Sequence, residues 1–156
     1  MEKEAVAQYS TLHPEYEVTE SGLLVHPTLC FLAASPARMV TDPQTGNLGV
    51  LEVKCPSSIL TTPTVAAVEK PSFCLYKVDG KVCLKRTHPY FSQVQGQMAC
   101  SELLWCDFAV LCGGELFVER VLFDAEKWAE GVAALKSFFF YYFARELLYP
   151  GFDEER

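Results

Sequence analysis

The most informative segment of this chain reads Leu51-Glu52-Val53-Lys54-Cys55-Pro56, with Ser35-Pro36-Ala37 upstream of it. The run up to Lys54 predicts a β-strand, and Pro56 ends it because proline has no amide hydrogen for a sheet. The turn-forming residues 42–47 separate this strand from Met39–Thr41, so we expect a β-hairpin. Side chains alternate across a strand, which places Glu52 and Lys54 on the same face.

A carboxylate beside an ammonium group suits chemistry at a phosphodiester. The carboxylate of Glu52 is a hard oxygen ligand for Mg²⁺. The amine of Lys54 can orient or deprotonate water and stabilise charge on a phosphate. By itself, Glu-x-Lys is weak support, because such pairs also occur by chance on the exposed faces of strands.

The rest of the chain predicts one central sheet with helices packed on it, within a single domain over 1–156. An antiparallel meander is expected over 16–34, and a second hairpin around Asp79-Gly80. Two further strands meet at Gly113-Gly114. Helices are expected over 2–12, 63–70, 88–103 and 124–149, the last with Asp124 as N-cap. The fold class is α/β (α+β).

Charge and cysteine content limit the classes of function. The formal net charge of −7 argues against binding a polyanion by bulk attraction, although a basic stretch runs from Lys70 to Arg86. Seven cysteines without CxxC spacing predict reduced thiols in an intracellular protein, cytoplasmic or nuclear. The apolar run 137–144 is shorter than the ~20 residues of a membrane span and predicts a core helix.

Further motifs accompany the Glu-x-Lys strand. Gln93-Val94-Gln95 and Trp105-Cys106-Asp107-Phe108 follow it in order. Together with Ser35-Pro36, this series resembles the YqaJ-type viral recombinase family, which includes phage lambda exonuclease and belongs to the PD-(D/E)xK nuclease superfamily. The resemblance runs from Glu2 to the last helix. It implies a restriction-endonuclease-like core with a central mixed sheet, and a Mg²⁺-dependent deoxyribonuclease of DNA recombination that degrades duplex DNA from its ends.

The resemblance also implies a role for each matching residue. Glu52, the carbonyl of Val53 and Glu2 would bind Mg²⁺ or Mn²⁺. Lys54 would be the catalytic lysine, and Gln93 would position water or phosphate. The residues expected to contact DNA are Ser35, Arg38, Lys85, Arg86, Tyr90 and Gln97. The competing interpretations are a solvated helix face for the two glutamines and a core position for Tyr90.

One ligand of the family pattern is missing. After Ser-Pro the family has a metal-binding Asp, and this chain has Ala37, which weakens the expected metal binding and disables cleavage. Three explanations are open: a natural pseudonuclease, a deliberate substitution, or rescue by another carboxylate. A deliberate substitution is favoured, because all other residues of the site pattern are present. Asp42 is the nearest candidate for rescue, but it falls in the predicted turn.

Two other functions therefore compete with a nuclease: a DNA-binding domain without catalysis, and a protein-interaction domain. Because Glu2 directly follows Met1, we also expect that a preceding segment that grips DNA ends is missing. We expect duplex DNA ends as the partner and no membrane. Oligomeric state and digestion polarity do not follow from the motifs.

Overall fold

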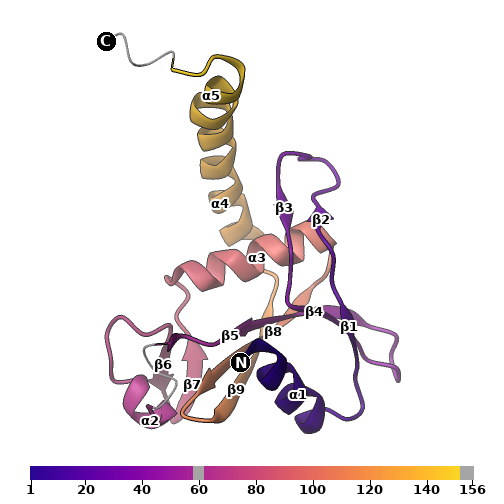
Figure 1. The fold of residues 1–156 in the computed structure, drawn as a ribbon, viewed down its shortest axis with the longest axis vertical. Helices are drawn as coiled ribbons and strands as arrows, with labels where there is room; N and C mark the ends of the chain where they lie inside the picture. Colours follow the sequence, from indigo (N-terminus) through magenta and orange to yellow (C-terminus); the bar gives the residue numbers. More distant parts are fainter. Residues whose placement is uncertain (58–61, 152–156) are drawn as a thin grey trace. The chain divides into compact units, whose positions relative to one another are not determined.

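A mixed five-stranded sheet organises the first part of the chain (Figure 1). The computed structural model describes residues 1–57 and 62–151. Along the sheet the strands follow the order β1 (Glu17–Glu20), β4 (Arg38–Thr41), β5 (Leu48–Lys54), β8 (Trp105–Cys112) and β9 (Glu115–Leu122). Only β5 and β8 pair in parallel, and the crossover between them carries α2 (Thr64–Ala67) and α3 (Pro89–Ser101).

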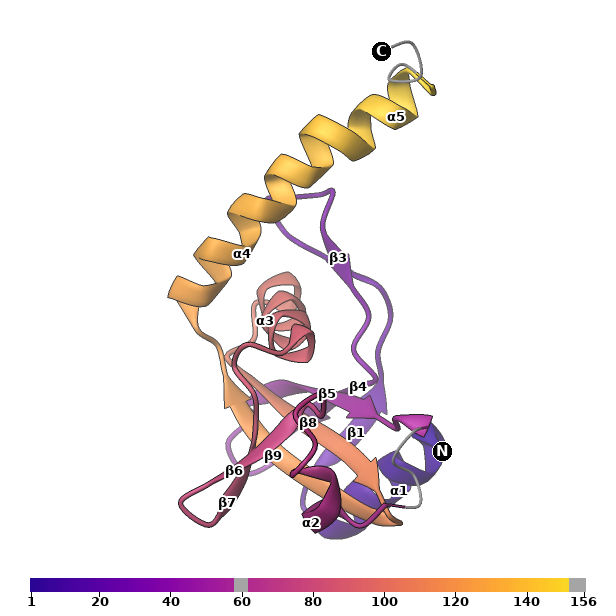
Figure 2. The same ribbon diagram turned by 90° about the vertical axis from the view of Figure 1, so that its left-hand side faces the viewer.

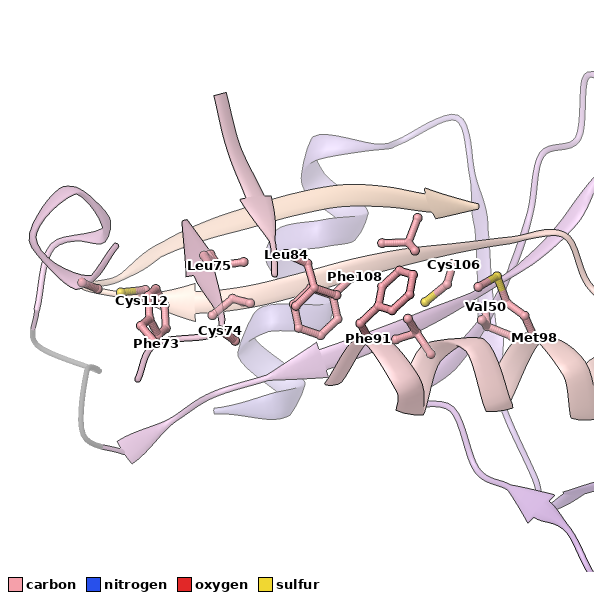
Figure 3. Packing of buried hydrophobic residues seen from close by; sticks show 14 residues of the cluster. Val50, Phe73, Cys74, Leu75, Leu84, Phe91, Met98, Cys106, Phe108 and Cys112 are labelled. Atoms are coloured by element: carbon pink, nitrogen blue, oxygen red, sulfur yellow. The ribbon is translucent and has the colours of Figure 1, made fainter. Parts of the chain in front are cut away.

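Two helices cover opposite faces of this sheet (Figure 2). On one face α1 (Glu2–Leu12) packs Ala5 and Tyr9 against Leu51. On the other face α3 packs Val94 and Met98 into a second cluster. Figure 3 shows this cluster, with labels on Val50, Phe73, Cys74, Leu75, Leu84, Phe91, Met98, Cys106, Phe108 and Cys112. Neighbouring residues of β5 supply the two clusters because side chains alternate along a strand.

Both predicted hairpins are confirmed. Between β4 and β5, the Asp42 carboxylate accepts hydrogen bonds from the Gln44 amide at 2.9 Å and the Thr45 hydroxyl at 2.8 Å. These bonds lower the pKa of Asp42. Between β6 (Leu75–Val78) and β7 (Lys81–Leu84), Asp79 and Gly80 both have positive φ, as a two-residue hairpin requires.

The predicted meander over 16–34 is wrong. β1 pairs with β4 of the central sheet, whereas β2 (Leu24–Val25) and β3 (Ala33–Ala34) form a separate two-stranded ribbon. The register of β1 sets Val18 beside the fully buried Val40. Pairing with β4 therefore adds apolar burial that the short ribbon does not provide.

The chain divides into two units, Met1–Phe123 and Asp124–Arg156. A single domain over 1–156 stays a prediction. In the second unit α4 (Ala125–Phe138) continues through a π-helical turn, η2 (Phe139–Phe143), into α5 (Ala144–Leu148). Asp124 caps α4 by accepting a hydrogen bond from the Lys127 amide at 3.0 Å, as predicted.

The predicted core helix in this unit is wrong, because no side chain of α4, η2 or α5 is buried. Six consecutive aromatic residues, 138–143, are distributed around the whole circumference of one helix. In the described part of this unit, residues 124–151, there is no second element for the helix to pack against. Across residues 1–57 and 62–151, no helix is both long enough and apolar enough to cross a membrane.

All seven cysteines lie in the described part of the chain, and all are free thiols, as expected. Four of them are buried, namely Cys74, Cys100, Cys106 and Cys112. Burial raises the pKa of Cys74 to about 11. Burial also raises the pKa of Cys100 and Cys106, so these three thiols are protonated apolar fillers of the core at neutral pH.

Candidate active site

The carboxylate of Glu52 lies at the centre of the site. Glu52 is 5% exposed and lies on β5, the middle strand of the sheet. Lys54 Nζ donates a hydrogen bond to Glu52 Oε1 at 2.6 Å, so the prediction that both side chains share a face is confirmed. A surface cross-strand pair is excluded, because burial makes this ion pair part of the interior.

Two glutamines of α3 complete the hydrogen bonding of this carboxylate. Gln93 Nε2 donates to Glu52 Oε1 at 2.8 Å, and Gln97 Nε2 donates to Glu52 Oε2 at 2.7 Å. The two glutamines are one helical turn apart, which lets one helix face reach both oxygens. The predicted position of Gln93 beside the site is therefore correct, and its action on water or phosphate stays a prediction.

The predicted contact of Gln97 with DNA stays a prediction, which the burial of this residue does not favour. This residue is 2% exposed, and its amide nitrogen is engaged with Glu52. The same burial excludes the alternative interpretation of Gln97 as part of a solvated helix face. Within residues 1–57 and 62–151, Gln97 Oε1 is the only buried side-chain nitrogen or oxygen without a hydrogen-bond partner. Its role is to hold the carboxylate, at the cost of leaving its own oxygen unpaired.

Tyr90 lies at the start of the same helix, next to Lys54. Lys54 Nζ is 4.6 Å from the centre of the Tyr90 ring, within the range of a cation–π interaction. Tyr90 is partly buried against the α3-side core, so it is both a site residue and a core residue. The helix is capped by His88, whose Nδ1 accepts a hydrogen bond from the Tyr90 amide at 3.2 Å.

A polar cavity of about 290 Å³ opens beside Glu52. Ala37 lines this cavity together with Glu52, and it directly precedes Arg38, which pairs with Leu51 of β5. That position 37 is a metal-ligand position stays a prediction. The cavity brings together most of the residues predicted for the metal site, with lining from Glu2, Ser21, Ser35, Pro36, Ala37, Arg38, Glu52 and Val53.

Arg38 places its guanidinium between the backbone of Ala37 and the carboxylate of Glu2. Arg38 Nη1 donates a hydrogen bond to the backbone oxygen of Ala37. The same nitrogen lies 3.6 Å from Glu2 Oε1 on α1. The side chain of Arg38 is 22% exposed and that of Glu2 is 60% exposed, so the arginine is the more enclosed partner.

The donor set does not fit a divalent metal as it stands. Glu2 and Glu52 are the two acidic residues of the cavity, and each is paired with a cation, Arg38 or Lys54. The formal charges of these four residues cancel. In the described ranges, no group of three His, Cys, Asp or Glu side chains could hold a metal ion. A hard dication needs several oxygen ligands with net negative charge, and Ala37 removes one.

Other predicted residues lie outside this cavity. Asp42 is engaged in the β4–β5 turn and does not line it, so rescue by Asp42 is not supported. Lys85 Nζ donates to the Pro71 carbonyl at 2.7 Å, and Arg86 pairs with Glu119 at 2.9 Å. Contact of Lys85 and Arg86 with DNA stays a prediction.

A second buried polar cluster was missed by the sequence analysis. Asp107, 2% exposed, accepts hydrogen bonds from Tyr9 at 2.6 Å and from two nitrogens of Arg120, each at 2.8 Å. Burial, together with Asp107, raises the pKa of Tyr9. The signal was a lone charged residue inside the apolar run of β8, since buried charges require partners.

This cluster positions the site indirectly. Tyr9 and Glu2 are on the same helix, so the bond from Tyr9 to Asp107 fixes α1 against β8. Arg120 also lies over the Trp105 ring, 3.8 Å from its centre. The indole in turn leaves no room for a side chain at Gly49, where an added Cβ would come within 2.3 Å of Trp105.

Comparisons with known proteins agree with this architecture. The crystal structure of LHK-Exo in complex with dAMP matches with a TM-score of 0.67 and 28% identity, over 96% of this chain and 68% of that one. The crystal structure of an alkaline exonuclease (LHK-Exo) from Laribacter hongkongensis matches with a TM-score of 0.60 and 29% identity, over 88% and 62%. The chain thus spans about two thirds of these proteins. No curated protein matches it.

The fold is therefore restriction-endonuclease-like, as the resemblance implied. A family model described as the YqaJ-like viral recombinase domain matches residues 1–103, which include the whole of α1, the Glu52–Lys54 strand and α3. The chain belongs to the family of YqaJ-like viral recombinase domains.

Proposed function

We propose that this chain is a DNA nuclease domain of the exonuclease type that holds DNA but cuts it very slowly, because its metal site lacks the carboxylate at position 37. The family and the alkaline exonuclease neighbours support a DNA exonuclease. The observation that carries the proposal is the Glu52–Lys54 pair, held by α3 beside a polar cavity that includes position 37.

The residues present suit part of this chemistry. Lys54 is 18% exposed and oriented by Glu52, so its ammonium group can stabilise negative charge on a phosphate. Gln93 is exposed and can donate a hydrogen bond to the same phosphate or to water. The chemistry also needs a dication, which would be Mg²⁺ or Mn²⁺. A bound dication is worth several kcal/mol of transition-state stabilisation, and ~4 kcal/mol is about a thousandfold in rate.

Restoring the carboxylate tests the proposal. With Ala37→Asp the cavity would contain three carboxylates, a set suited to a hard cation. We expect Mg²⁺-dependent hydrolysis of linear duplex DNA, about a thousandfold faster than in the parent chain. Lys54→Ala in the Ala37→Asp background should abolish it. Ala33→Asp adds the same charge at an exposed position of β3 and serves as the matched control.

The assay is the release of nucleotides from end-labelled linear duplex, with single-stranded DNA in parallel and with either Mg²⁺ or Mn²⁺. If Ala37→Asp remains folded and inert on both substrates, the catalytic proposal fails. Comparing blunt ends with overhangs, and labels at 5′ and 3′ ends, would define the end preference and the polarity.

A DNA-binding domain without catalysis is the second candidate. The cancelled charges of the cavity favour it, because they disfavour a dication there. It shares DNA binding with the first candidate and differs only if Ala37→Asp gives no hydrolysis. A protein-interaction domain predicts no DNA affinity even at low salt, whereas binding through several phosphates falls steeply as salt rises.

A further inference from the structure

We propose that Arg38 takes the place of the metal, so that the cavity binds a DNA phosphate without a divalent ion. This inference rests on the proposed function, since it assumes that DNA is the ligand. It follows from the mismatch between the cavity and a metal site. At position 37 the family pattern requires an anionic ligand for a dication, whereas this chain has Ala37 there and the cation Arg38 directly after it.

The position of the guanidinium carries the inference. Arg38 Nη1 bonds to the backbone oxygen of Ala37, the residue that lacks the carboxylate, and lies 3.6 Å from Glu2. The guanidinium therefore lines the same cavity as Glu52 and Val53. Within the described ranges, both contacts of this group use Nη1. The remaining nitrogen donors of the planar group match the geometry of a phosphate.

The balance of charges favours an anion over a dication in this cavity. A dication would have to separate Arg38 from Glu2 and Lys54 from Glu52, and it would then be repelled by both freed cations. A phosphodiester needs only the first of these pairs to open. That pair is long, and its acidic partner is 60% exposed, so it holds Arg38 weakly.

The second pair remains closed in this arrangement. Lys54 and Glu52 are 2.6 Å apart and enclosed, with Gln93 and Gln97 completing the carboxylate's hydrogen bonds. Glu52 is thereby neutralised within its own network and does not repel the incoming phosphate strongly. The cavity then acts as a monoanion site built on one arginine.

Fluorescence anisotropy with a short labelled blunt duplex tests this at low, matched ionic strength, in EDTA and in Mg²⁺. We expect the parent chain to bind equally well, within about twofold, in both buffers. Arg38→Gln should weaken binding in EDTA by about tenfold, and Arg38→Lys by less, because it keeps the charge and loses the planar donors. Arg145→Gln, the same substitution on α5, is the control.

Calorimetric titration with MgCl₂ gives a readout independent of DNA. The parent chain should show no Mg²⁺ binding, and Ala37→Asp should show it. The inference is overturned if the parent chain binds Mg²⁺, if it needs Mg²⁺ to bind the duplex, if it does not bind the duplex in EDTA, or if Arg38→Gln binds as well as Arg145→Gln. None of these outcomes decides whether Ala37→Asp hydrolyses DNA, so failure of the inference and failure of the proposed function are distinguishable.

Discussion

The burial of one carboxylate dominates the site at the scale of single residues. Taking an ion out of water costs several kcal/mol unless hydrogen bonds and a counter-charge replace its hydration. Glu52 receives one ammonium donor and two amide donors, so both of its oxygens are satisfied. The remaining cost falls on Gln97 Oε1, which is buried without a partner.

Replacing the buried glutamine tests this account. Gln97→Leu removes the donor to Glu52 Oε2 and leaves a charged oxygen unsatisfied in the interior. We expect the free energy of unfolding to fall by about 1.5–3 kcal/mol, the range for hydrogen bonds to charged groups. Urea denaturation followed by circular dichroism measures it.

Gln93→Leu is the matched control, because the same substitution on the same helix removes a bond to the same carboxylate at an exposed position. Water can replace that donor, so the loss should stay below about 1 kcal/mol. Equal losses for the two variants would show that burial does not decide the strength of these bonds.

At the scale of elements, the site depends on how α1 and α3 are fixed to the sheet. Tyr9 anchors α1 to β8 through Asp107, and His88 caps the N-terminus of α3. α1 carries Glu2 and α3 carries both glutamines. Each anchor therefore positions residues that it does not touch.

Removing the Tyr9 hydroxyl should loosen α1. In Tyr9→Phe the buried Asp107 loses a 2.6 Å hydrogen bond, with an expected loss of about 1.5–3 kcal/mol in unfolding free energy. Tyr16→Phe is the control. Among residues 1–57 and 62–151 the Tyr16 hydroxyl makes only an exposed 3.4 Å hydrogen bond, with Arg120, so its loss should cost less than about 0.5 kcal/mol. Chemical denaturation of both variants checks this, and the anchor assignment fails if Tyr16→Phe is the more damaging change.

The cap of α3 should make stability depend on pH. His88 accepts a hydrogen bond through Nδ1, which requires the neutral ring, and burial together with the charge of Lys85 lowers the pKa of His88. A base with a lowered folded pKa stabilises the fold above its unfolded pKa of about 6.5, and this contribution is lost as pH falls through the folded value. The stability of the parent chain should therefore decline as the pH falls below about 6.5, the unfolded pKa of histidine.

His88→Asn keeps a capping side chain that does not titrate. Its unfolding free energy should be within about 1 kcal/mol of the parent value at neutral pH. The decline toward acid should be smaller than in the parent chain. Denaturant midpoints of the two proteins across the pH series measure the difference, and parallel pH profiles would contradict the assigned cap.

At the scale of the whole molecule, both apolar clusters lie within the first unit. Every residue of the two clusters falls between Ala5 and Phe123, and no side chain of α4, η2 or α5 is buried. The second unit instead exposes large apolar side chains such as Phe140, Tyr142 and Leu148. The first unit thus has the core that independent stability requires.

Residues 1–123 should consequently fold by themselves. We expect a single cooperative urea transition, with a free energy of unfolding within about 1 kcal/mol of that of the full chain, because core burial is the main favourable contribution. Circular dichroism and limited proteolysis of the full chain, with cleavage expected near Asp124, check this. A shortened chain that is unfolded or aggregated would instead support the single domain predicted over 1–156.

The features that depend on neighbouring residues could be predicted from the sequence alone. The Glu52–Lys54 face, the two hairpins, the Asp124 cap and the α3 segment all follow from strand alternation, turn chemistry and helical periodicity. The order of motifs was sufficient for the family. These are local or pairwise patterns, and they are legible before any packing is known.

The partner of each buried polar group, in contrast, became known only from the packed fold. It buried Gln97 under Glu52, turned Arg38 toward the Ala37 carbonyl and joined β1 to β4. It also revealed the buried Asp107–Arg120 pair. These partners are distant in sequence, or their pairing depends on which elements compete for the same space. The free energies of these contacts are therefore set by the packed fold, and no local pattern of residues predicts them.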